Sequence, residues 1–442
     1  MAMDKPCLAS SRRWRAASAH PFHLHKEPLS MEDTTVCVLG LGYIGLPTSA
    51  VMAARGARVF GTDVNPRVVD TINAGGIHIV EPELDEFVRA AVGSGKLTAH
   101  LQPQPADVFI IAVPTPFRDG HAPDLSYVDA ATLALAPVLK AGDLVILEST
   151  SPVGTTERVA ALLAQARPDL RVPQADGDAC DIHVAHCPER VLPGQVIREL
   201  VENDRIVGGI TTMCTDRAIA FYRRFVDGQC LATTARTAEM CKLTENAFRD
   251  VNIAFANELS LISDRMGVDV WELIRLANRH PRVNILQPGC GVGGHCIAVD
   301  PWFIVDSAPE QARLIRAARI VNDGKPDFVI ERTRALATER GATRIGIFGL
   351  AFKPDIDDLR ESPALVIAHR LASEFEILVV EPHIDALPNV LSQGVRATLV
   401  TAEDALARCD LLLVLVRHRA FPPLLRALGT DKTVLDVCGA LQ

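Results

Sequence analysis

Two cysteines lie in a glycine-rich stretch late in the sequence, and their setting determines what the stretch can do. Residues 284–301 are NILQPGCGVGGHCIAVDP, with thiols at Cys290 and Cys296. A phosphate-binding glycine loop usually follows a strand, whereas NRHPRVNILQP, with its two prolines, predicts an irregular loop. A cysteine is more often a small buried hydrophobe than a nucleophile. Asp300, four residues after Cys296, favours the remaining interpretation, a reactive thiol at Cys296.

An earlier glycine cluster predicts a dinucleotide site. The apolar run TVCVL is followed by Gly40, Gly42 and Gly45, a helical stretch, and a second apolar run that ends at Asp63. The glycines allow a tight turn, close approach of a pyrophosphate, and close packing of helix on strand. Asp63, 18 residues after Gly45, can bind both ribose hydroxyls, which favours NAD over NADP. A thiol beside a nicotinamide can trap an aldehyde as a thiohemiacetal, which loses hydride to give a thioester.

A third group of chemically active side chains lies on one predicted helix. The segment from Thr237 to Gly267 has no Pro or Gly before its end, which predicts a single long helix. Lys242, Asn246 and Arg249 fall on one face of it. The ordinary interpretation is a solvated stripe. Because the stripe mixes an amide with two cations and its flanks are apolar, we favour a site for an anionic or polyhydroxy ligand.

A fourth group lies in GLAFKPDIDDLRESP, which begins at residue 349. Lys353 and Arg360 flank the acids Asp355, Asp357 and Asp358. Either cation could bind a phosphate, or both could serve only in ion pairs, and spacing alone favours neither. The turn lacks the GxGxxG spacing, so no second dinucleotide is predicted.

Alternating strands and helices must position these groups. Apolar runs at 107–116, 143–150, 181–190 and 204–209 follow the first two, with helical stretches between most of them. This alternation predicts a Rossmann-type, doubly wound parallel sheet, whose ligands bind at the carboxyl ends of the strands. Thr115, Thr150 and Glu189 fall at such ends. The runs EILVVEP, CDLLLVLV and TVLDVCG, after RIGIFGL, predict a second α/β domain of Rossmann-like type, so the fold class is α/β with a long central helix.

Composition excludes several classes of protein. The net charge of −9 argues against nucleic-acid binding, and no apolar run is long enough to span a membrane. Eleven scattered cysteines without a CxxC pair fit a reducing cytoplasm better than a disulfide framework. The residues before Met31 show neither an apolar period nor a signal-peptide core, which predicts a disordered extension.

Motifs along most of the chain, in one order, resemble those of a known enzyme family. They are GLGYIGLP, VPTP, ESTSPVGTT, CPER, KLTENAFRD, GVGGHCIAVDP and GLAFKPDIDDLRESP. From about Thr35 to its end the chain is similar to the nucleotide-sugar 6-dehydrogenases, the superfamily of UDP-glucose and UDP-N-acetylmannosamine dehydrogenases. The resemblance implies a four-electron oxidation at C6 of a UDP-sugar, from alcohol to carboxylate, with two NAD+ used in turn.

The resemblance also implies roles for individual residues and no metal. Cys296 would be the nucleophile, Lys242 would stabilise the oxyanion, and Asn246 would bind the same oxygen or a water. Asp300 would tune Lys242 or that water, Glu189 would activate water to hydrolyse the thioester, and Thr150 would orient it. The implied cofactor-binding residues are Gly40, Gly42, Tyr43, Ile44, Gly45, Asp63, Arg67, Thr115, Thr150 and Arg360, the last from across a domain or subunit boundary. The implied substrate-binding residues are Arg190, Val191, Lys242, Asn246, Arg249, His280, Arg282, Gly293 and Lys353.

The expected organisation has four parts. Residues 1–33 form a disordered extension, 34–235 an NAD-binding domain, 236–322 a central helical domain, and 323–442 a UDP-sugar-binding domain. The resemblance further implies a homodimer or higher homo-oligomer, with the long helix as the dimer core.

Within the superfamily, three stretches point to the branch that oxidises UDP-N-acetyl-D-mannosamine. They are CPERVLPG, ENAFRDVNIAFANELSLI and ANRHPRVNILQPGCGVGGHCIAVDPWFIV. UDP-glucose enzymes typically carry a second glutamate four residues after the Glu of their PE motif, and this chain has Pro193 there. UDP-glucose and UDP-N-acetylglucosamine remain the alternative substrates.

Two further classes remain open. A two-electron dehydrogenase of the 6-phosphogluconate or hydroxyacyl-CoA kind shares the first domain and a middle helix, and needs no cysteine. An NAD-responsive binding protein without activity is the other, and intact Lys242, Asn246, Cys296 and Asp300 count against it.

Overall fold

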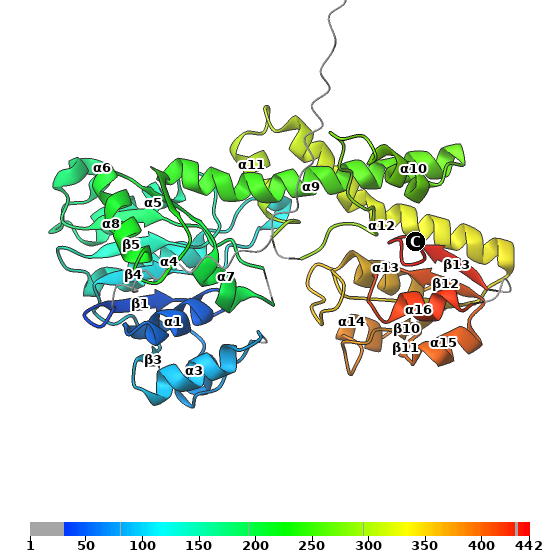
Figure 1. Ribbon diagram of the computed structural model, residues 1–442, viewed down its shortest axis with the longest axis horizontal. Coiled ribbons are helices and arrows are strands. Elements are labelled where there is room, and N and C mark those ends of the chain that lie inside the picture. Colours follow the sequence, from blue (N-terminus) through cyan, green and yellow to red (C-terminus); the bar gives the residue numbers. More distant parts are fainter. Residues whose placement is uncertain (1–30, 80, 193, 295, 429–431) are drawn as a thin grey trace, which may run out of the picture.

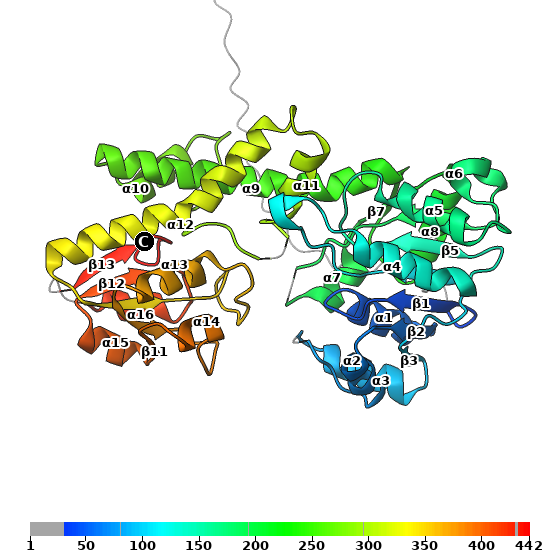
Figure 2. The ribbon, with the colours of Figure 1, turned by 180° about the vertical axis from the view of Figure 1, so that it is seen from behind.

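The computed structural model describes residues 31–442 except 80, 193, 295 and 429–431. Two α/β bodies, each built on a mainly parallel sheet, are joined by the long helices α9 (Ala235–Met266) and α12 (Arg313–Arg340). Figures 1 and 2 show α9 running along one side of both bodies. The predicted α/β class, with a doubly wound sheet, a long central helix and a second α/β domain, is confirmed.

The first sheet has eight strands in the order β3-β2-β1-β4-β5-β6-β7-β8. Side chains alternate between its two faces. Val36 and Val38 enter one core, and Cys37 and Leu39 enter the other, because successive side chains of a strand point to opposite sides. The strands are β1 Thr35–Leu39, β2 Arg58–Thr62, β3 Leu97–His100, β4 Val108–Ile111, β5 Leu144–Leu147, β6 His183–His186, β7 Arg205–Gly209 and β8 Cys230–Thr234.

Helices cover both faces of this sheet. They are α1 Gly45–Ala54, α2 Pro66–Asn73, α3 Leu84–Gly93, α4 Ser126–Leu135, α5 Thr155–Ala166, α6 Pro173–Asp176, α7 Val196–Glu202 and α8 Thr212–Tyr222, with short 3-10 turns η1 Asp119–His121, η2 Ala136–Val138 and η3 Gly177–Ala179.

The sheet differs from the expected pattern in two respects. Strand β7 runs antiparallel to β6, and every other pair in the sheet is parallel. Strands β3 and β8 are additions that their sequences did not predict, because LTAH and CLATT are short and only partly apolar.

The folded chain begins before the predicted boundary at residue 34. Met31 is fully buried in the first core, and its N–H donates to the carbonyl of Arg55. The prediction of disorder is therefore wrong for residues 31–33. The rest of the predicted extension lies outside the described residues.

The second sheet has five parallel strands in the order β11-β10-β9-β12-β13. Its alternate side chains also enter two cores, with Ile345 and Ile347 on one face and Phe348 on the other. The strands are β9 Arg344–Phe348, β10 Glu376–Val380, β11 Ala397–Leu399, β12 Leu411–Val414 and β13 Thr433–Asp436, and the helices are α13 Pro363–Ala372, α14 Asn389–Ser392, α15 Ala402–Arg408 and α16 Phe421–Arg426.

Buried polar contacts fix α9 against α12. The Arg319 guanidinium donates to the Asp250 carboxylate at 2.6 Å, and Asn322 donates to the same carboxylate at 2.8 Å. Asn257 donates to Asn322 and accepts from the backbone N–H of Gly289. Because buried polar groups need matched partners, these bonds specify one register of the helix pair and tie the glycine loop to it.

The predicted boundary between residues 322 and 323 falls inside α12, which continues through Pro326 to Arg340. The helix ends at Gly341, whose φ of +63° suits glycine. Two shorter helices, α10 (Val270–Ala277) and α11 (Asp300–Ser307), complete this region. The predicted domain limits stay a prediction.

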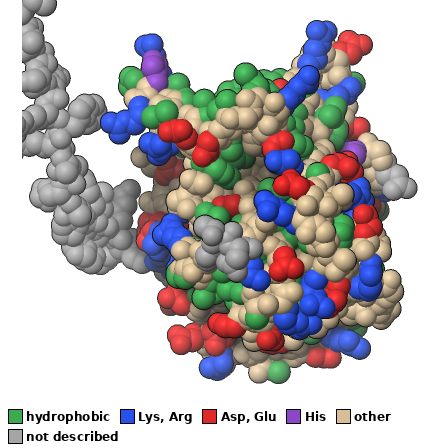
Figure 3. All heavy atoms as spheres, turned by 90° about the vertical axis from the view of Figure 1, so that its right-hand side faces the viewer, with side chains coloured by type: hydrophobic (Ala, Val, Ile, Leu, Met, Phe, Trp, Pro, Cys, Tyr) green, Lys and Arg blue, Asp and Glu red, His purple; other side chains and the backbone are tan. Residues whose placement is uncertain are grey.

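Charges are mixed on the face shown in Figure 3, where Lys and Arg side chains alternate with Asp and Glu. Among the described residues, no helix is both long and apolar enough to cross a membrane. The ten described cysteines are all free thiols.

Candidate active site

Cys296 and three polar residues form the centre of the site. Cys296 is exposed, and its carbonyl accepts from the backbone N–H groups of Val299 and Asp300. This turn places Cys296 just before α11, whose first residue is Asp300. The buried Asp300 carboxylate accepts from the Asn246 amide at 2.5 Å. Lys242, one helical turn before Asn246 on α9, interacts electrostatically with Asp300 and Cys296. The structure thus brings together four residues predicted from two separate motifs.

Burial dominates the electrostatics of this cluster. It raises the pKa of Asp300 to about 6, against the lowering effects of Asn246 and Lys242. The pKa of the Cys296 thiol is also raised, first by desolvation in the surrounding protein and then by the Asp300 charge, while Lys242 and Arg360 oppose this. The side chain is nevertheless open to solvent on one side, so a ligand can reach it.

The glycines before Cys296 pack against the second α/β body. A Cβ on Gly293 would lie 2.5 Å from the carbonyl oxygen of Glu361, and one on Gly294 would lie 2.8 Å from the Phe352 ring. Gly294 also has a φ of +81°, which favours glycine. This close contact answers the question raised by the sequence: the glycines let the Cys296 loop approach the turn at 352–363. Substrate binding by Gly293 stays a prediction.

The first glycine turn has the geometry expected of a dinucleotide loop. Gly40 has a φ of +91°, and a Cβ on Gly45 would lie 1.8 Å from the Gly40 carbonyl, so both positions require glycine. A Cβ on Gly42 would meet nothing within 4 Å, which leaves open space beside the loop. The Asp63 carboxylate accepts from the backbone N–H groups of Leu41 and Asn65 and so lies beside the loop.

Other predicted cofactor residues lie around this turn. Ile44 precedes the first residue of α1, and Arg67 is exposed on α2. The Arg360 guanidinium lies 5.0 Å from the centre of the Tyr43 ring, so the second body reaches the loop within one chain. The Thr115 hydroxyl donates to the Thr150 carbonyl at 2.5 Å, which joins the ends of β4 and β5.

Glu189 takes part in a buried ion pair that the sequence interpretation missed. Its carboxylate accepts from the Arg205 guanidinium at 2.6 Å, and both side chains are buried. Beside them, Tyr222 donates to Glu148 at 2.6 Å, and burial raises the pKa of Glu148 above its usual range. The available signal was the cation that opens the apolar run RIVGG, because a charge on a buried strand needs a partner.

The predicted sugar-site residues fall into two groups. Arg190 forms an ion pair with Glu245 on α9, 2.7 Å apart, and Val191 follows it partly buried. Arg249, His280 and Arg282 are exposed, the first on α9 and the others in the loop after α10. No described contact joins these three to Cys296, so their roles stay predictions. Pro193 lies outside the described residues.

The acidic turn of the second body is held mainly by local pairs. Arg360 pairs with Asp358, and Arg419 pairs with Asp355. Within the described part of the chain Lys353 forms no ion pair, which keeps a phosphate-binding role open for it. Glu381, just after β10, accepts from the backbone N–H groups of Leu350 and Ala351 and contacts His418 at 3.1 Å. The backbone N–H groups of the turn after β9 are therefore already bonded to a side chain of the protein.

Three family models match the chain in order. They are described as the NAD binding domain, the central domain and the UDP binding domain of the UDP-glucose/GDP-mannose dehydrogenase family, and match residues 34–226, 236–324 and 346–442. Together they span most of the sequence. The chain belongs to the UDP-glucose/GDP-mannose dehydrogenase family.

Relatives extend over almost the whole of this dehydrogenase. An NDP-N-acetyl-D-galactosaminuronic acid dehydrogenase of Ralstonia nicotianae is 61% identical, covering 93% of this chain and 97% of its own. A UDP-N-acetyl-D-mannosamine dehydrogenase of Yersinia pestis is 60% identical, covering 88% and 95%.

A solved structure has the same arrangement as this dehydrogenase. The UDP-D-ManNAc dehydrogenase of Pyrococcus horikoshii is 37% identical, with a TM-score of 0.81 over 92% of this chain and 96% of the other. The predicted family is therefore confirmed, and so is the prediction that the protein is an enzyme. The alternative of an NAD-responsive binding protein without activity is rejected. A nicotinamide cofactor and a UDP-sugar substrate follow from the family.

Proposed function

We propose that the protein oxidises C6 of a UDP-linked 2-acetamido-2-deoxyhexose, by preference UDP-N-acetyl-D-mannosamine, to the uronate with two NAD+ per product. The observation that carries the proposal is the cluster of Cys296, Asp300, Asn246 and Lys242. A two-electron dehydrogenase needs no thiol at the reacting carbon, whereas a thiol there can trap the C6 aldehyde and carry it to the acid through a thioester.

The residues present fit NAD. The loop at Gly42 leaves open space for a pyrophosphate, and Asp63 stands beside it with an acid in the position that repels a 2′-phosphate. When bound, NAD+ accepts one hydride in each of the two oxidations. Gly40 and Gly45 hold the turn, and Arg360, which lies over the Tyr43 ring and pairs with Asp358, would help hold the NAD phosphates.

Cys296 acts as the nucleophile. Its thiolate adds to the C6 aldehyde, and the thiohemiacetal becomes a thioester when the second hydride leaves. Lys242 and one Asn246 N–H stabilise the developing oxyanion, a contribution of roughly 3 kcal/mol for a single well-placed donor. The other Asn246 N–H is held by Asp300, which fixes the amide in place.

Hydrolysis of the thioester needs a positioned water. Glu189 accepts from the Arg190 N–H and from Arg205, so its carboxylate is fixed at the end of β6. We assign Glu189 to accept a proton from this water and Thr150 to orient it. Water attack then releases the uronate and returns Cys296 to the thiol state.

The sugar class rests on two kinds of support. Relatives near 60% identity are named for 2-acetamido sugars, both N-acetylmannosamine and N-acetylgalactosaminuronic acid. The CPERVLPG and NRHPRVNILQPG stretches resemble the N-acetylmannosamine branch. A site built to hydrogen-bond an acetamido group leaves buried polar groups unpaired with a 2-hydroxyl sugar, at roughly 1–3 kcal/mol each.

The second candidate substrate is UDP-N-acetyl-D-galactosamine. It is favoured by the relative at 61% identity, whose name differs from that of the relatives at 60%. The two candidates share the acetamido group and differ in configuration at C2, which bears that group, and at C4, which bears a hydroxyl.

The test is kcat/KM for UDP-N-acetylmannosamine, UDP-N-acetylgalactosamine, UDP-N-acetylglucosamine and UDP-glucose under identical conditions, with NADH counted per sugar consumed. We expect two NADH per product and a preference for the first sugar. Preference for UDP-glucose overturns the sugar class, and one NADH per product overturns the thioester chemistry. Cys296→Ser should form no acid while still binding NAD.

The preference for NAD has its own test at Asp63. Asp63→Ala should weaken NAD binding by about ten- to a hundredfold, since a charge-assisted hydrogen bond is worth roughly 1.5–3 kcal/mol. The gap between NAD and NADP should narrow at the same time. Titration of both cofactors by fluorescence measures this, and unchanged NAD affinity contradicts the assignment.

A further inference from the structure

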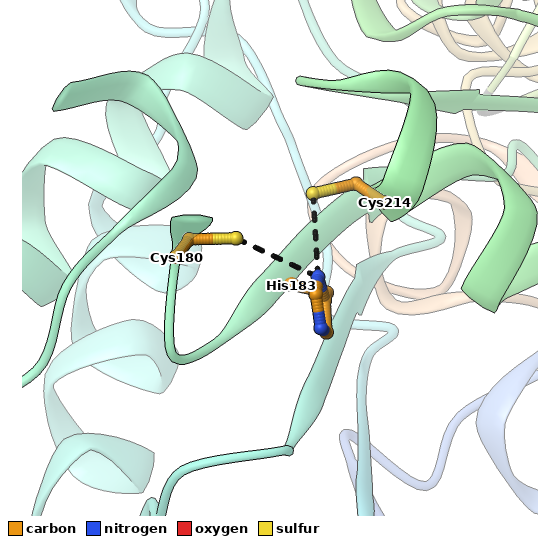
Figure 4. Close-up of side chains that lie close together, drawn as sticks. All are labelled: Cys180, His183 and Cys214. Atoms are coloured by element: carbon orange, nitrogen blue, oxygen red, sulfur yellow. Dashed lines mark hydrogen bonds between the residues drawn. The ribbon is translucent and has the colours of Figure 1, made fainter. Parts of the chain in front are cut away.

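A cluster of two thiols and an imidazole lies on the first sheet away from the Cys296 site. Cys180 follows η3, His183 opens β6, and Cys214 is on the first turn of α8. The Nδ1 atom of His183 lies 3.6 Å from the Cys180 sulfur and 3.9 Å from the Cys214 sulfur, as Figure 4 shows. The three ligand atoms lie within 4.8 Å of one another.

We propose that Cys180, His183 and Cys214 bind a soft divalent metal ion, zinc by preference. Zinc bonds of roughly 2.3 Å to sulfur and 2.0–2.1 Å to nitrogen, at tetrahedral angles, place the sulfur and nitrogen atoms about 3.6 Å apart. The sulfur and nitrogen atoms of the cluster therefore need to move little to bind an ion. Thiolate and imidazole together select zinc over the hard cations magnesium and calcium.

The surroundings of Cys214 suit a thiolate ligand. Its sulfur accepts from the Thr211 hydroxyl at 3.3 Å and from the Val184 N–H at 3.4 Å. Cys214 and His183 are buried, and Cys180 is only partly exposed. These three side chains supply three ligands of a tetrahedral site, and water would take the fourth position on the side where Cys180 is accessible. Metal binding releases two thiol protons and changes no oxidation state.

The cluster is independent of the proposed chemistry at Cys296. His183 is the first residue of β6, whereas Glu189 follows the other end of that strand. A strand of this length rises roughly 13 Å, so the two sites lie at opposite ends of β6. The ion would hold the η3 turn, β6 and α8 together, and its expected effect is on stability rather than on kcat.

The test compares the full-length wild type with Cys214→Ser, Cys180→Ser and the matched control Cys230→Ser, which changes a thiol on β8 outside the cluster. Zinc equivalents are counted after dialysis, and Co2+ titration reports thiolate-to-cobalt absorption. Because loss of an outer partner alone costs 10–100-fold in metal affinity, loss of a ligand should cost at least about a hundredfold. The sequence also has histidines at positions 20, 23 and 25, outside the described residues. These histidines and Cys296 are the same in all four proteins, so any metal that they bind does not change the comparison.

The proposal expects one more tight equivalent, a cobalt–thiolate spectrum and a zinc-dependent rise in Tm for the wild type and Cys230→Ser. Both cluster variants should lack all three, with Cys180→Ser as the milder change should Cys214→Ser fail to fold. Equal stoichiometry in all four proteins, a cobalt spectrum without thiolate bands, or a Cys180–Cys214 disulfide in place of the metal would overturn it.

Discussion

Asp300 has the clearest pH dependence among the residues around Cys296. Its pKa in the folded chain is about 6, above the ordinary value of 3.8, because burial disfavours the carboxylate. The folded state therefore binds this proton more tightly than the unfolded chain, and the wild type loses stability as pH rises from about 4 to 6. Asp300→Asn lacks this loss and should be relatively more stable at pH 7, by at most roughly 3 kcal/mol.

Activity should move in the opposite direction. Because the carboxylate accepts from the Asn246 amide, we expect wild-type kcat to rise as pH passes about 6. Asp300→Asn should lack this rise and lose most of its rate. Paired profiles of Tm and kcat between pH 4 and 8 measure this. A difference in Tm between the two proteins that does not change with pH would contradict the assignment.

Arg205 should matter for stability as much as for chemistry. Arg205→Leu leaves Glu189 buried without its cation, and breaking a buried pair in this way costs about 3–5 kcal/mol. The double variant Arg205→Leu, Glu189→Leu should recover part of this loss, because no unpaired charge remains. Urea unfolding of the single and double variants gives the coupling energy, and simple additivity would show that the pair is not coupled.

At the scale of elements, the glycine loop before Cys296 packs against the second α/β body. Gly293→Ala places a methyl group 2.5 Å from the Glu361 carbonyl and should separate the Cys296 loop from the second body. The matched control is Gly289→Ala, whose nearest atom would be 4.0 Å away. We expect Gly293→Ala to lower kcat/KM at least about tenfold, the effect of small misplacements in active sites, and Gly289→Ala to stay near wild type. Equal rates for the two would show that the contact is not needed.

For the whole molecule, the predicted oligomer has a candidate surface on α9. Phe248, Phe255 and Ile262 are 70%, 53% and 45% exposed and recur every seven residues, which forms one apolar stripe on the helix. Such a stripe is unusual on an isolated surface helix. We infer that two copies of the chain pair along it.

The stripe is tested by charge. Phe248→Glu with Phe255→Glu should convert the dimer to a monomer in size-exclusion chromatography with light scattering. Leu133→Glu, at an exposed position on α4, is the control and should leave the mass unchanged. A wild-type monomer, or a dimer that survives the double change, would place the interface elsewhere.

The fold could be predicted from the sequence to the extent that its signals are local. The spacing of Gly40, Gly42 and Gly45, the apolar runs and the uninterrupted α9 each depend on neighbouring residues, so their types alone specified the turn, the strands and the helix. Motif order then identified the family. Short or partly polar strands such as β3 and β8 lacked such a signal, and they form because they pair with β2 and β7.

Tertiary structure decided which distant residues meet. Cys296 and Asp300 were associated by a spacing of four, but the hydrogen bond from Asn246 to Asp300 and the electrostatic interaction of Lys242 with both residues depend on α11 packing on α9. The pairs Glu189–Arg205 and Gly293–Glu361, and the cluster of Cys180, His183 and Cys214, join segments whose separation along the chain carries no periodic signal. Sheet order and helix packing bring these segments together. Polar groups that become buried there are stable only when they have partners, and residues distant in the sequence supply them.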